Sequence, residues 1–330
     1  MTDMNNRAPD NISHSTVVAL CGGIGGAKLA LGLYRILAPD RLTIVINTGD
    51  DFEHLGLFIS PDIDTVTYTL ANKNNIETGW GQRDETWSFM SALSELGGET
   101  WFSLGDRDLA IHIERSSRLR SSELLSDITT DVANKFGIKA KLLPMTNDPA
   151  ATIINTSEGQ MNFQDYFVRM KCKPVIKQVL YEEASLATPN PEVLKALNQI
   201  EVNAIILCPS NPFLSMDPIL AVPGIREAIL QSAAPVVGVS PIIGGRAVKG
   251  PTSKIMKELS LPLTVQTLVQ HYSPLLDGFI IDDVDRDLLN QIKIPVRTTN
   301  TLMNNLVDRE NLAREVLKFA NEIQENNSKS

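Results

Sequence analysis

Residues 16–46, TVVALCGGIGGAKLALGLYRILAPDRLTIVI, decide the fold of this chain. Thr16–Cys21 is a short apolar run rich in β-branched residues, which predicts a buried strand. Glycines follow it directly, and leucines and isoleucines then recur at helical spacing until Pro39 ends the pattern. Leu42–Ile46 supplies a second buried strand. The stretch therefore predicts a strand, a glycine turn, a helix and a strand, which together form a βαβ unit.

Apolar runs and helical patterns alternate through the second half of the chain. Strands are expected at residues 140–143, 152–154, 175–181, 204–208, 235–239, 279–281 and 294–296, and helices at 191–199, 218–231, 265–271 and 305–323. Such alternation predicts an α/β fold of the Rossmann-like, doubly wound type, with a mostly parallel sheet covered on both faces. We expect one α/β domain over residues 16–325, a largely helical insertion over about 79–136, a disordered tail over 1–15 and a frayed tail over 326–330.

Composition limits the class of protein. The chain has 330 residues, of which 43% are hydrophobic, and a formal net charge of -9. An acidic chain without a polybasic tract offers no broad surface to a phosphate backbone, so we expect no nucleic-acid partner. No apolar run approaches the roughly 18 residues of a membrane span, and the N-terminus lacks the order of a signal peptide. We therefore expect a cytoplasmic protein without a membrane partner.

Cysteines and histidines are few and scattered. Cys21, Cys172 and Cys208 lack CxxC spacing, which argues against a disulfide framework or a zinc knuckle. The four histidines do not cluster either, so a histidine-based metal site or a Ser-His-Asp triad has little support.

The glycine-rich loop after the first strand predicts a phosphate contact. Glycines let the backbone approach a ligand closely, and the following helix presents unpaired N–H groups and a positive dipole end. The alternative is a turn whose glycines only permit close packing of the strand against the helix. The residues assigned to substrate binding in this loop and the first helical turn are Gly22, Gly23, Gly25, Gly26 and Lys28.

This loop matches neither common nucleotide fingerprint. GxGxxG would need a glycine where Lys28 stands, and the P-loop pattern would need one where Ala27 stands. Asn47 occupies the tip of the second strand, where a dinucleotide-binding protein carries an acid. An NAD-dependent dehydrogenase and a P-loop NTPase are both disfavoured.

Carboxylates gather directly after the second strand. Asp50 and Asp51 leave the strand tip beside the proposed phosphate site. Two carboxylates repel a diphosphate unless a cation lies between them, and Mg2+ typically bridges one or two carboxylates to substrate phosphates. We therefore expect Asp50 and Asp51 to hold Mg2+, and solvated loop acids are the alternative.

Asp62 has a structural explanation of its own. It follows Ser60 as the helix N-cap and Pro61 at the first helical position, where its charge favours the helix dipole. Asp64 stays undecided between structure and function. Further along, the aromatic residues of the insertion are candidates to stack a planar ring, although aromatics at helical spacing more often belong to a core.

Polar loops follow several later strands and are expected at the same edge of the sheet. The loop over residues 240–251 combines three glycines, two cations and a following helix start, which favours an anionic group. An ordinary exposed loop is its alternative. The residues of these loops that we assign to substrate binding are Ser210, Asn211, Ser240, Gly244, Gly245, Arg246 and Lys249.

Several segments together resemble one family. They are GGIGGAKLALGL, VINTGDDFEHLGLFISPDIDTVTYTL, GWGQRDETW, LGDRDLAIHI, LLPMTNDP, CPSNPFLS and VSPIIGGRAVKGP. Over about residues 17–320 the chain resembles the 2-phospho-L-lactate transferase family, called CofD in archaea and FbiA in mycobacteria. The archaeal pattern has a Thr-Pro pair where Gly26 and Ala27 stand here, so the archaeal acid specificity does not carry over.

The resemblance implies a transferase of coenzyme F-420 biosynthesis. In that family a guanylyl-activated phospho-acid meets the deazaflavin Fo, whose ribityl hydroxyl attacks the phosphate next to the acid, and GMP leaves. The resemblance puts the family's metal-binding acid at Asp51, with Asp50 beside it, and deazaflavin Fo near Asp51, Arg83 and Thr86. Asp50 or Asp62 would take the hydroxyl proton. The phospho-acid (phospholactyl, phosphoenolpyruvyl or 3-phosphoglyceryl) stays open, and a homodimer is implied.

A rival reading comes from another class of protein. Nucleotide-sugar-binding regulatory proteins typified by YvcK share the fold and the glycine loop with this family. The segments GWGQRDETW and LGDRD and the nearly full-length match favour the enzyme.

Overall fold

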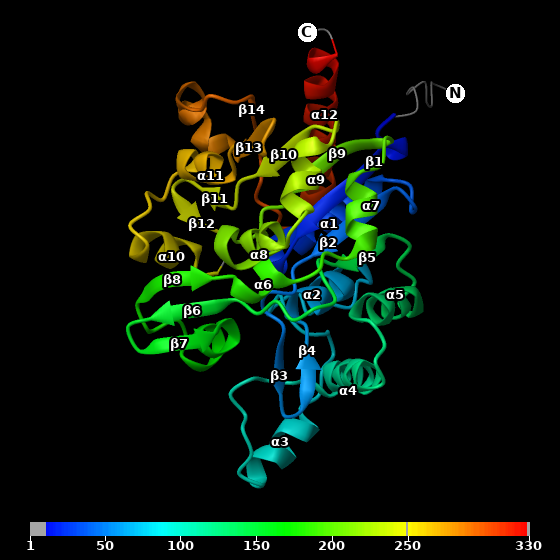
Figure 1. Cartoon of the computed structure of the whole chain (residues 1–330), viewed down its shortest axis with the longest axis vertical. Coiled ribbons are helices and arrows are strands. Elements are labelled where there is room, and N and C mark those ends of the chain that lie inside the picture. The colour runs from blue at the N-terminus through cyan, green and yellow to red at the C-terminus, as the bar shows by residue number, and fades with distance from the viewer. Residues whose placement is uncertain (1–10, 249, 329–330) are drawn as a thin grey trace, which may run out of the picture.

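The computed structural model describes residues 11–248 and 250–328. Its centre is a seven-stranded sheet in the order β14-β13-β10-β9-β1-β2-β5 (Figure 1). Every neighbouring pair in this sheet is parallel. The strands are β1 (Thr16–Cys21), β2 (Leu42–Ile46), β5 (Lys141–Pro144), β9 (Val202–Leu207), β10 (Val236–Val239), β13 (Gly278–Asp282) and β14 (Val296–Thr299).

The order of the strands shows how the sheet is wound. From β1 the chain moves outward through β2 to β5, then crosses to β9 on the other side of β1 and continues outward to β14. The direction of winding therefore reverses between β1 and β9. Parallel sheets of this kind bind ligands outside the carboxyl ends of the strands at such a reversal. The doubly wound α/β fold expected from the sequence is confirmed.

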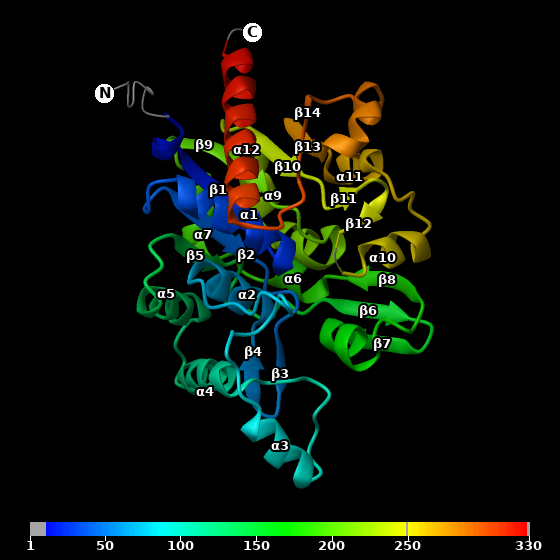
Figure 2. The ribbon, with the colours of Figure 1, turned by 180° about the vertical axis from the view of Figure 1, so that it is seen from behind.

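Helices cover both faces of this sheet because side chains along each strand alternate between two cores. Val17, Ala19 and Cys21 of β1 pack against one layer of helices, while Val18 and Leu20 pack against the other. The first layer, in front in Figure 2, contains α1 (Gly23–Ile36), α2 (Pro61–Leu70), α5 (Leu125–Lys135) and α12 (Leu306–Asn327). The second layer contains α7 (Pro191–Leu197), α8 (Asp217–Ala221), α9 (Ile225–Gln231), α10 (Thr252–Glu258) and α11 (Val265–Tyr272).

A protrusion extends from one end of the molecule, at the bottom of Figure 1. It consists of a hairpin of β3 (Phe52–His54) and β4 (Leu57–Ile59), followed by α3 (Ser88–Glu95) and α4 (Asp106–Arg120). Ile59, Met90 and Leu104 form its small core. The sequence predicted a largely helical insertion over about 79–136 but gave no strands for residues 52–59.

A second sheet changes one expectation about topology. The apolar runs near residues 153 and 176 do form strands, β6 (Ile153–Thr156) and β8 (Ile176–Leu180), but they lie outside the main sheet, where β6 pairs antiparallel with both β7 (Gly159–Asn162) and β8. The two-residue connection from β6 to β7 makes their pairing antiparallel, because parallel pairing needs a crossover of a dozen or more residues. A short helix, η2 (Asp165–Arg169), follows β7.

Some predicted boundaries were wrong. The helix expected over 218–231 is two helices, because Pro223 and Gly224, with φ at 85°, interrupt it. Residues 11–14 of the expected disordered tail form η1 (Asn11–His14), and α12 continues into the tail that was expected to fray. The remaining elements are α6 (Glu182–Leu186), η3 (Pro212–Met216), β11 (Ile242–Ile243), β12 (Arg246–Ala247) and η4 (Asp283–Gln291).

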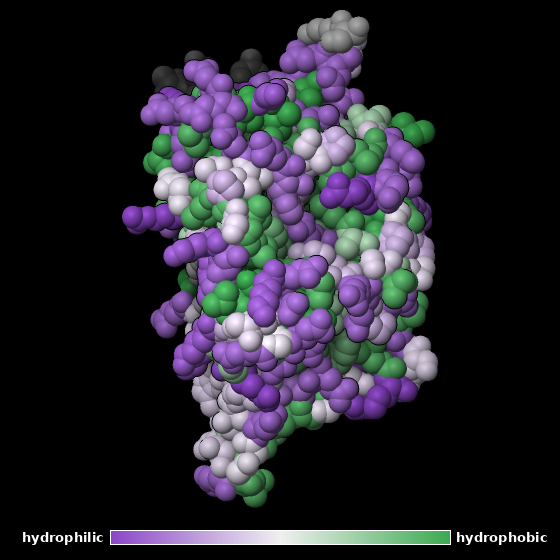
Figure 3. Space-filling model, turned by 60° about the vertical axis from the view of Figure 1, so that its left-hand side comes forward, coloured by the Kyte–Doolittle hydropathy of each residue, from purple (hydrophilic) through white to green (hydrophobic). Residues whose placement is uncertain are grey.

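Polar side chains cover most of the face shown in Figure 3, with apolar patches between them. Across residues 11–248 and 250–328, none of the helices combines the length and the apolar character that crossing a bilayer requires.

Candidate active site

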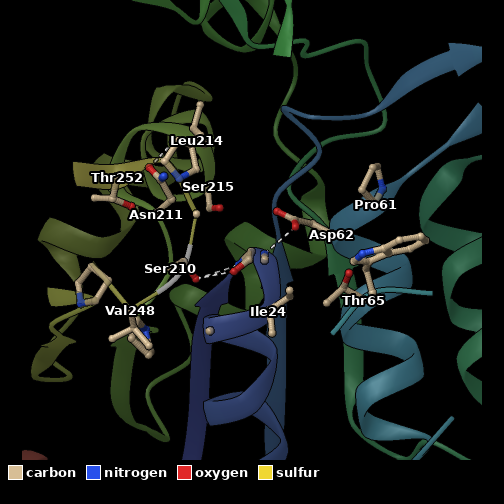
Figure 4. Close-up of a pocket in the computed structure, with 18 of the residues that line it drawn as sticks. Ile24, Pro61, Asp62, Thr65, Ser210, Asn211, Leu214, Ser215, Val248 and Thr252 are labelled. Atoms are coloured by element: carbon tan, nitrogen blue, oxygen red, sulfur yellow. Dashed lines mark hydrogen bonds between the residues drawn. The ribbon is translucent and has the colours of Figure 1, made fainter. Parts of the chain in front are cut away.

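A cavity of about 580 Å³ lies at the point where the direction of winding reverses. Its lining includes the loops that follow β1, β2, β9 and β10, together with parts of the insertion and of the segment 163–168 after β7. Figure 4 shows Ser210 and Ile24 at the N-terminus of α1, with Val248 and Thr252 on one side and Pro61 and Thr65 on the other. The cavity therefore extends across the start of α1.

The glycine loop is joined to the loop after β9 by one serine. The Ser210 hydroxyl accepts from the Gly22 N–H at 3.1 Å and donates to the Gly22 carbonyl at 2.7 Å. A Cβ atom on Gly25 would lie 2.4 Å from the Pro209 carbonyl oxygen, and one on Gly26 would lie 2.4 Å from Ser210 Oγ. Close packing of these two loops therefore requires glycine at both positions. Contact of this backbone with a phosphate stays a prediction.

Asn47 connects two carboxylates at the edge of the cavity. Its Nδ2 donates to Asp50 Oδ1 at 3.1 Å and to Asp62 Oδ2 at 2.9 Å. The side-chain oxygen of Asn47, Oδ1, accepts from the Gly49 N–H at 2.8 Å, so the orientation of the side-chain amide is fixed. Asn47 is fully buried, and both acids line the cavity. One amide at the tip of β2 therefore joins two carboxylates, one from the loop after β2 and one from the start of α2.

Asp62 does more than begin a helix. It is in the first turn of α2, as the sequence predicts, but its Oδ1 accepts from the Gly23 N–H at 2.6 Å. Ser60 occupies the N-cap position without capping the helix, since its hydroxyl donates instead to Asp51 Oδ2 at 2.9 Å. The interpretation of Asp62 as chiefly a helix-start residue was wrong, because its carboxylate faces the first amide of α1.

Burial raises the pKa of all three acids near the tip of β2. For Asp50, the neighbouring charges of Asp62 and Asp51 raise the pKa further. Burial raises the pKa of Asp62 to about 6, although hydrogen bonds from Asn47 and Gly23 lower it. Burial also raises the pKa of Asp51, and the positive charge of Arg115 opposes that rise. A site that destabilises negative charge in this way is suited to a cation.

Asp51 lies apart from the other two acids. It is absent from the cavity lining found in the described residues, and its Oδ1 is a buried oxygen with no hydrogen-bond partner among them. The Ser60 hydroxyl donates to its other oxygen, Oδ2, at 2.9 Å. The expected pairing of Asp50 with Asp51 at a metal ion stays a prediction, and the geometry adds Asp62, which shares the Asn47 amide with Asp50.

Asp64, undecided from the sequence, forms a buried ion pair with Arg115. Its Oδ2 lies 3.7 Å from His112 Nδ1. Burial lowers the pKa of this histidine to about 4. The cluster joins α2 to α4 and stabilises the protrusion, so Asp64 has a structural role.

The donor set suits one kind of metal ion. No group of three or more His, Cys, Asp or Glu side chains in the described part of the chain is arranged to hold a metal. Mg2+, however, is often held by only one or two carboxylates and completes its coordination with water and substrate phosphates. Asp50 and Asp62, buried and mutually repelling, fit an ion of that kind.

The other predicted substrate residues divide into two groups. Lys28, Ser210, Asn211 and Ser240 line the cavity with Gly22, Gly23 and Gly25. Lys28 Nζ donates to the Met303 carbonyl at 2.8 Å, and Ser240 Oγ donates to the Ile242 carbonyl at 2.9 Å. Asn211 Nδ2 is buried and has no partner among the described residues, so it is available to a ligand.

The second group lies elsewhere. Arg83 and Thr86 belong to the protrusion outside the cavity lining, and Thr86 donates to Asp106 at 2.5 Å. Gly244 and Gly245 line a separate cavity of about 320 Å³. Asp285 accepts from the Gly244 N–H there at 3.0 Å, and a carboxylate at this position disfavours the anionic group that the loop predicted. Arg246 lies in β12 with an exposed side chain, and Lys249 lies outside the described residues.

Comparison with known proteins decides the family. The model of the family described as 2-phospho-L-lactate transferase CofD matches residues 17–322. This chain belongs to the CofD family. It is therefore a phosphotransferase of the 2-phospho-L-lactate transferase type.

Curated relatives of this CofD-family chain carry two names. A phosphoenolpyruvate transferase from Streptomyces coelicolor is 40% identical over 94% of this chain and 99% of its own length. Another from Kitasatospora aureofaciens is 38% identical over 93% and 98%. A 2-phospho-L-lactate transferase from Methanosarcina mazei is 39% identical over 82% of this chain and 88% of its own length.

A solved structure shows the same fold at low identity. It is a member of the UPF0052 family from Bacillus halodurans, with a TM-score of 0.61, 16% identity, and coverage of 92% of this chain and 99% of that one. At this identity the likeness concerns the fold alone.

Some cavity residues of this CofD-family chain had no signal in the sequence. Gln164 Nε2 donates to Asp50 Oδ2 at 3.4 Å, although 114 positions separate the two residues. Phe163 and Phe167 lie on either side of it in sequence and also line the cavity. The sequence drew attention to Asn47 only because dinucleotide-binding proteins have an acidic residue at that strand tip. Its contact with both carboxylates depends on the tertiary fold.

Proposed function

We propose that this enzyme transfers a phospho-acid group from its guanylyl-activated diphosphate to the ribityl hydroxyl of the deazaflavin Fo. GMP leaves, and the product belongs to coenzyme F-420 biosynthesis. The observation that carries the proposal is the pair Asp50 and Asp62, joined by Asn47 at a cavity that begins at the glycine loop. Family membership and the names of the relatives support it.

Mg2+ is part of the proposal, with Asp50 and Asp62 as its protein ligands. Bound there, it would offset the negative charge of the substrate diphosphate as the leaving group forms. Among the described residues, two carboxylates line the cavity, Asp50 and Asp62, and two ligands of this kind would leave coordination positions for substrate oxygens.

The chain's own residues contribute positioning and proton transfer. Phosphoryl transfer depends mostly on positioning and on neutralising charge. Asn47 fixes the separation of the two acids, and Asn211 Nδ2 offers a hydrogen bond to a substrate oxygen. A carboxylate near the attacking hydroxyl accepts its proton.

The test is a reconstituted reaction. The protein is mixed with deazaflavin Fo, Mg2+ and one activated acid at a time, namely the guanylyl derivatives of phospholactate, phosphoenolpyruvate and 3-phosphoglycerate. Mass spectrometry then identifies the product. We expect one Fo adduct and an equal amount of GMP, and we expect Asp50→Asn and Asp62→Asn to abolish both. A protein that yields no adduct with any of the three donors contradicts the proposal.

The same experiment separates the enzyme from the regulatory alternative. A nucleotide-sugar-binding regulator should neither bind deazaflavin Fo nor release GMP in its presence. The homodimer implied by the resemblance belongs to this proposal as well, and light scattering on the purified protein measures it.

A further inference from the structure

Gln164 is a buried residue whose amide reaches one of the two acids at the cavity. It lines the cavity, and its Nε2 donates to Asp50 Oδ2 at 3.4 Å. The other oxygen of this acid, Oδ1, accepts from Asn47 Nδ2 at 3.1 Å. Each oxygen of the Asp50 carboxylate therefore has one amide donor. One donor comes from the tip of β2 and the other from the segment after β7.

Backbone hydrogen bonds fix the position of Gln164 relative to the loop of the acid. The Thr152 N–H donates to the Gly49 carbonyl at 2.6 Å, and the Phe163 N–H donates to the Thr152 carbonyl at 3.1 Å. These two bonds join the residues that directly precede Asp50 and Gln164 in the chain. A Cβ atom on Gly49 would lie 2.6 Å from Thr152 Oγ1, so the two segments approach each other closely.

The helix that follows Gln164 is held by contacts of its own. η2 is a single turn of π-helix, a rare conformation that is frequent at functional sites. Its Tyr166 is fully buried, and its Arg169 forms an ion pair at 3.0 Å with Glu99 of the loop between α3 and α4. The backbone around Gln164 is therefore fixed without a bound ligand.

A carboxylate that binds a metal ion is usually hydrogen-bonded to a further protein group. Such outer partners orient the ligand oxygens, and their loss typically costs about 10–100-fold in metal affinity or activity. An ionised carboxylate only accepts hydrogen bonds, at about four lone-pair positions, so two amide donors leave positions free for a cation. Gln164 and Asn47 are therefore compatible with a metal ion on Asp50.

We propose that Gln164 is a positioning residue of the Mg2+ site, whose amide orients Asp50 so that this carboxylate binds the ion together with Asp62. This inference rests on the proposed function, because it concerns the Mg2+ site of that transfer. Gln164 acts through Asp50. The segment after the second sheet, which supplies neither acid, thereby takes part in the reaction.

Two substitutions of Gln164 test this role. Gln164→Leu keeps a similar bulk but removes the donor. Gln164→Asn keeps the amide but withdraws it by one methylene from an atom that it reaches only at 3.4 Å. Gln160→Leu is the matched control, because Gln160 is an exposed residue of β7 in the same segment of the chain. Urea unfolding shows which fraction of each variant is folded.

The first measurement is the dissociation constant of Mn2+ in the presence of saturating GDP, followed by electron paramagnetic resonance. Mn2+ replaces Mg2+ because both ions prefer carboxylate and water oxygens. Gln164→Leu and Gln164→Asn should weaken Mn2+ binding about tenfold, the low end of the usual range, because the hydrogen bond is long and its donor is neutral. Gln160→Leu should stay within about twofold of wild type, because it contacts no ligand of the ion.

The second measurement is GMP release in the proposed reaction as the Mg2+ concentration is varied. In the two Gln164 variants the Mg2+ concentration that gives half of the maximal rate should rise about tenfold. The rate at saturating Mg2+ should fall by a smaller factor, because excess ion fills the weakened site. A residue that only stabilises the fold would lower the folded fraction without moving this half-saturation point.

Two results would overturn the inference and leave the proposed transfer intact. One is a Mn2+ dissociation constant that Gln164→Leu leaves unchanged. The other is weaker binding of deazaflavin Fo alone, followed by its fluorescence, with unchanged Mn2+ binding, since Gln164 would then contact the acceptor. Wild-type protein that binds Mn2+, shows the expected losses in both Gln164 variants and yet forms no adduct contradicts the proposed function alone. Wild-type protein that binds no Mn2+ in the presence of GDP contradicts both this inference and the proposed Mg2+ site.

Discussion

The substitution Asn47→Ala tests the organisation of the site most directly. In the wild type, the Asn47 amide donates to Asp50 at 3.1 Å, to Asp62 at 2.9 Å and to the Leu214 carbonyl at 3.1 Å. Alanine removes all three contacts and leaves two buried carboxylates without the donor that they share. The variant should therefore be less stable, and its acids should lose their fixed separation.

The size of the effect follows from these contacts. A hydrogen bond to a charged group contributes about 1.5–3 kcal/mol, so two such bonds set an upper limit of roughly 6 kcal/mol. Both acids line a cavity that admits water, and water recovers part of this loss. We expect the free energy of unfolding to fall by about 3 kcal/mol. Turnover in the proposed reaction should fall about 10²-fold, the usual effect of misplacing a reacting group by about 1 Å.

Urea denaturation followed by circular dichroism measures the stability, and GMP release at saturating substrates measures the turnover. Asn203→Ala is the matched control, because its side chain makes one exposed hydrogen bond, to the Thr16 N–H at 2.7 Å. That control should cost no more than about 1 kcal/mol. The reasoning fails if Asn47→Ala unfolds within 0.5 kcal/mol of wild type, since an amide that holds two buried charges cannot be removed at so small a cost.

Three further substitutions test other parts of the structure. Arg115→Leu should destabilise the fold by about 3–5 kcal/mol because it leaves Asp64 buried and unpaired, and a change below 1 kcal/mol in thermal or urea unfolding would contradict this. Burial and the charge of Asp64 raise the pKa of Asp108 to about 7, so this acid stabilises the fold below pH 4 and loses that contribution as pH rises through 7. Asp108→Asn should remove this decrease of the free energy of unfolding with pH and raise that free energy at pH 8 by up to about 4 kcal/mol. Urea unfolding curves from pH 4 to 8 measure the pH dependence, and a variant with the same pH dependence as wild type would refute the assignment. Gly25→Ala should cost about 1–3 kcal/mol, measured by urea unfolding, because its Cβ would lie 2.4 Å from the Pro209 carbonyl oxygen; wild-type stability would show that the two loops separate freely.

Most strands of the main sheet were predictable from sequence, because their buried residues form apolar runs and glycine or proline residues lie beside those runs. The first two strands have the bounds that their apolar runs indicate, because glycine follows one and Pro39 precedes the other. The β3-β4 hairpin was missed for a local reason. Its turn is Leu55-Gly56, with φ of 54° and 71°, and a leucine in the left-handed region gives none of the usual Asn-Gly signal.

The sequence predicts where in the fold the candidate site lies, but it does not predict which side chains contact one another there. Glycines and acids after the first two strands indicate the edge of the sheet where the cavity lies, because parallel strands end there together. Which acid turns toward the cavity depends on partners far away in sequence. Ser60 donates to Asp51, which is absent from the cavity lining, whereas Asn47 donates to both Asp50 and Asp62.

The hydrogen bond between Asp62 and Gly23 joins the glycine loop to the acid pair, so the two features form one site. The first amides of a helix are where a phosphate would ordinarily bind, yet the Asp62 carboxylate already accepts from the Gly23 N–H at 2.6 Å. A phosphate approaching α1 therefore meets a carboxylate at the same helix terminus. Repulsion would exclude it unless a cation neutralises Asp62. The position of this one acid thus couples the proposed phosphate contact to the proposed Mg2+ site, and neither feature of the sequence predicts that coupling alone.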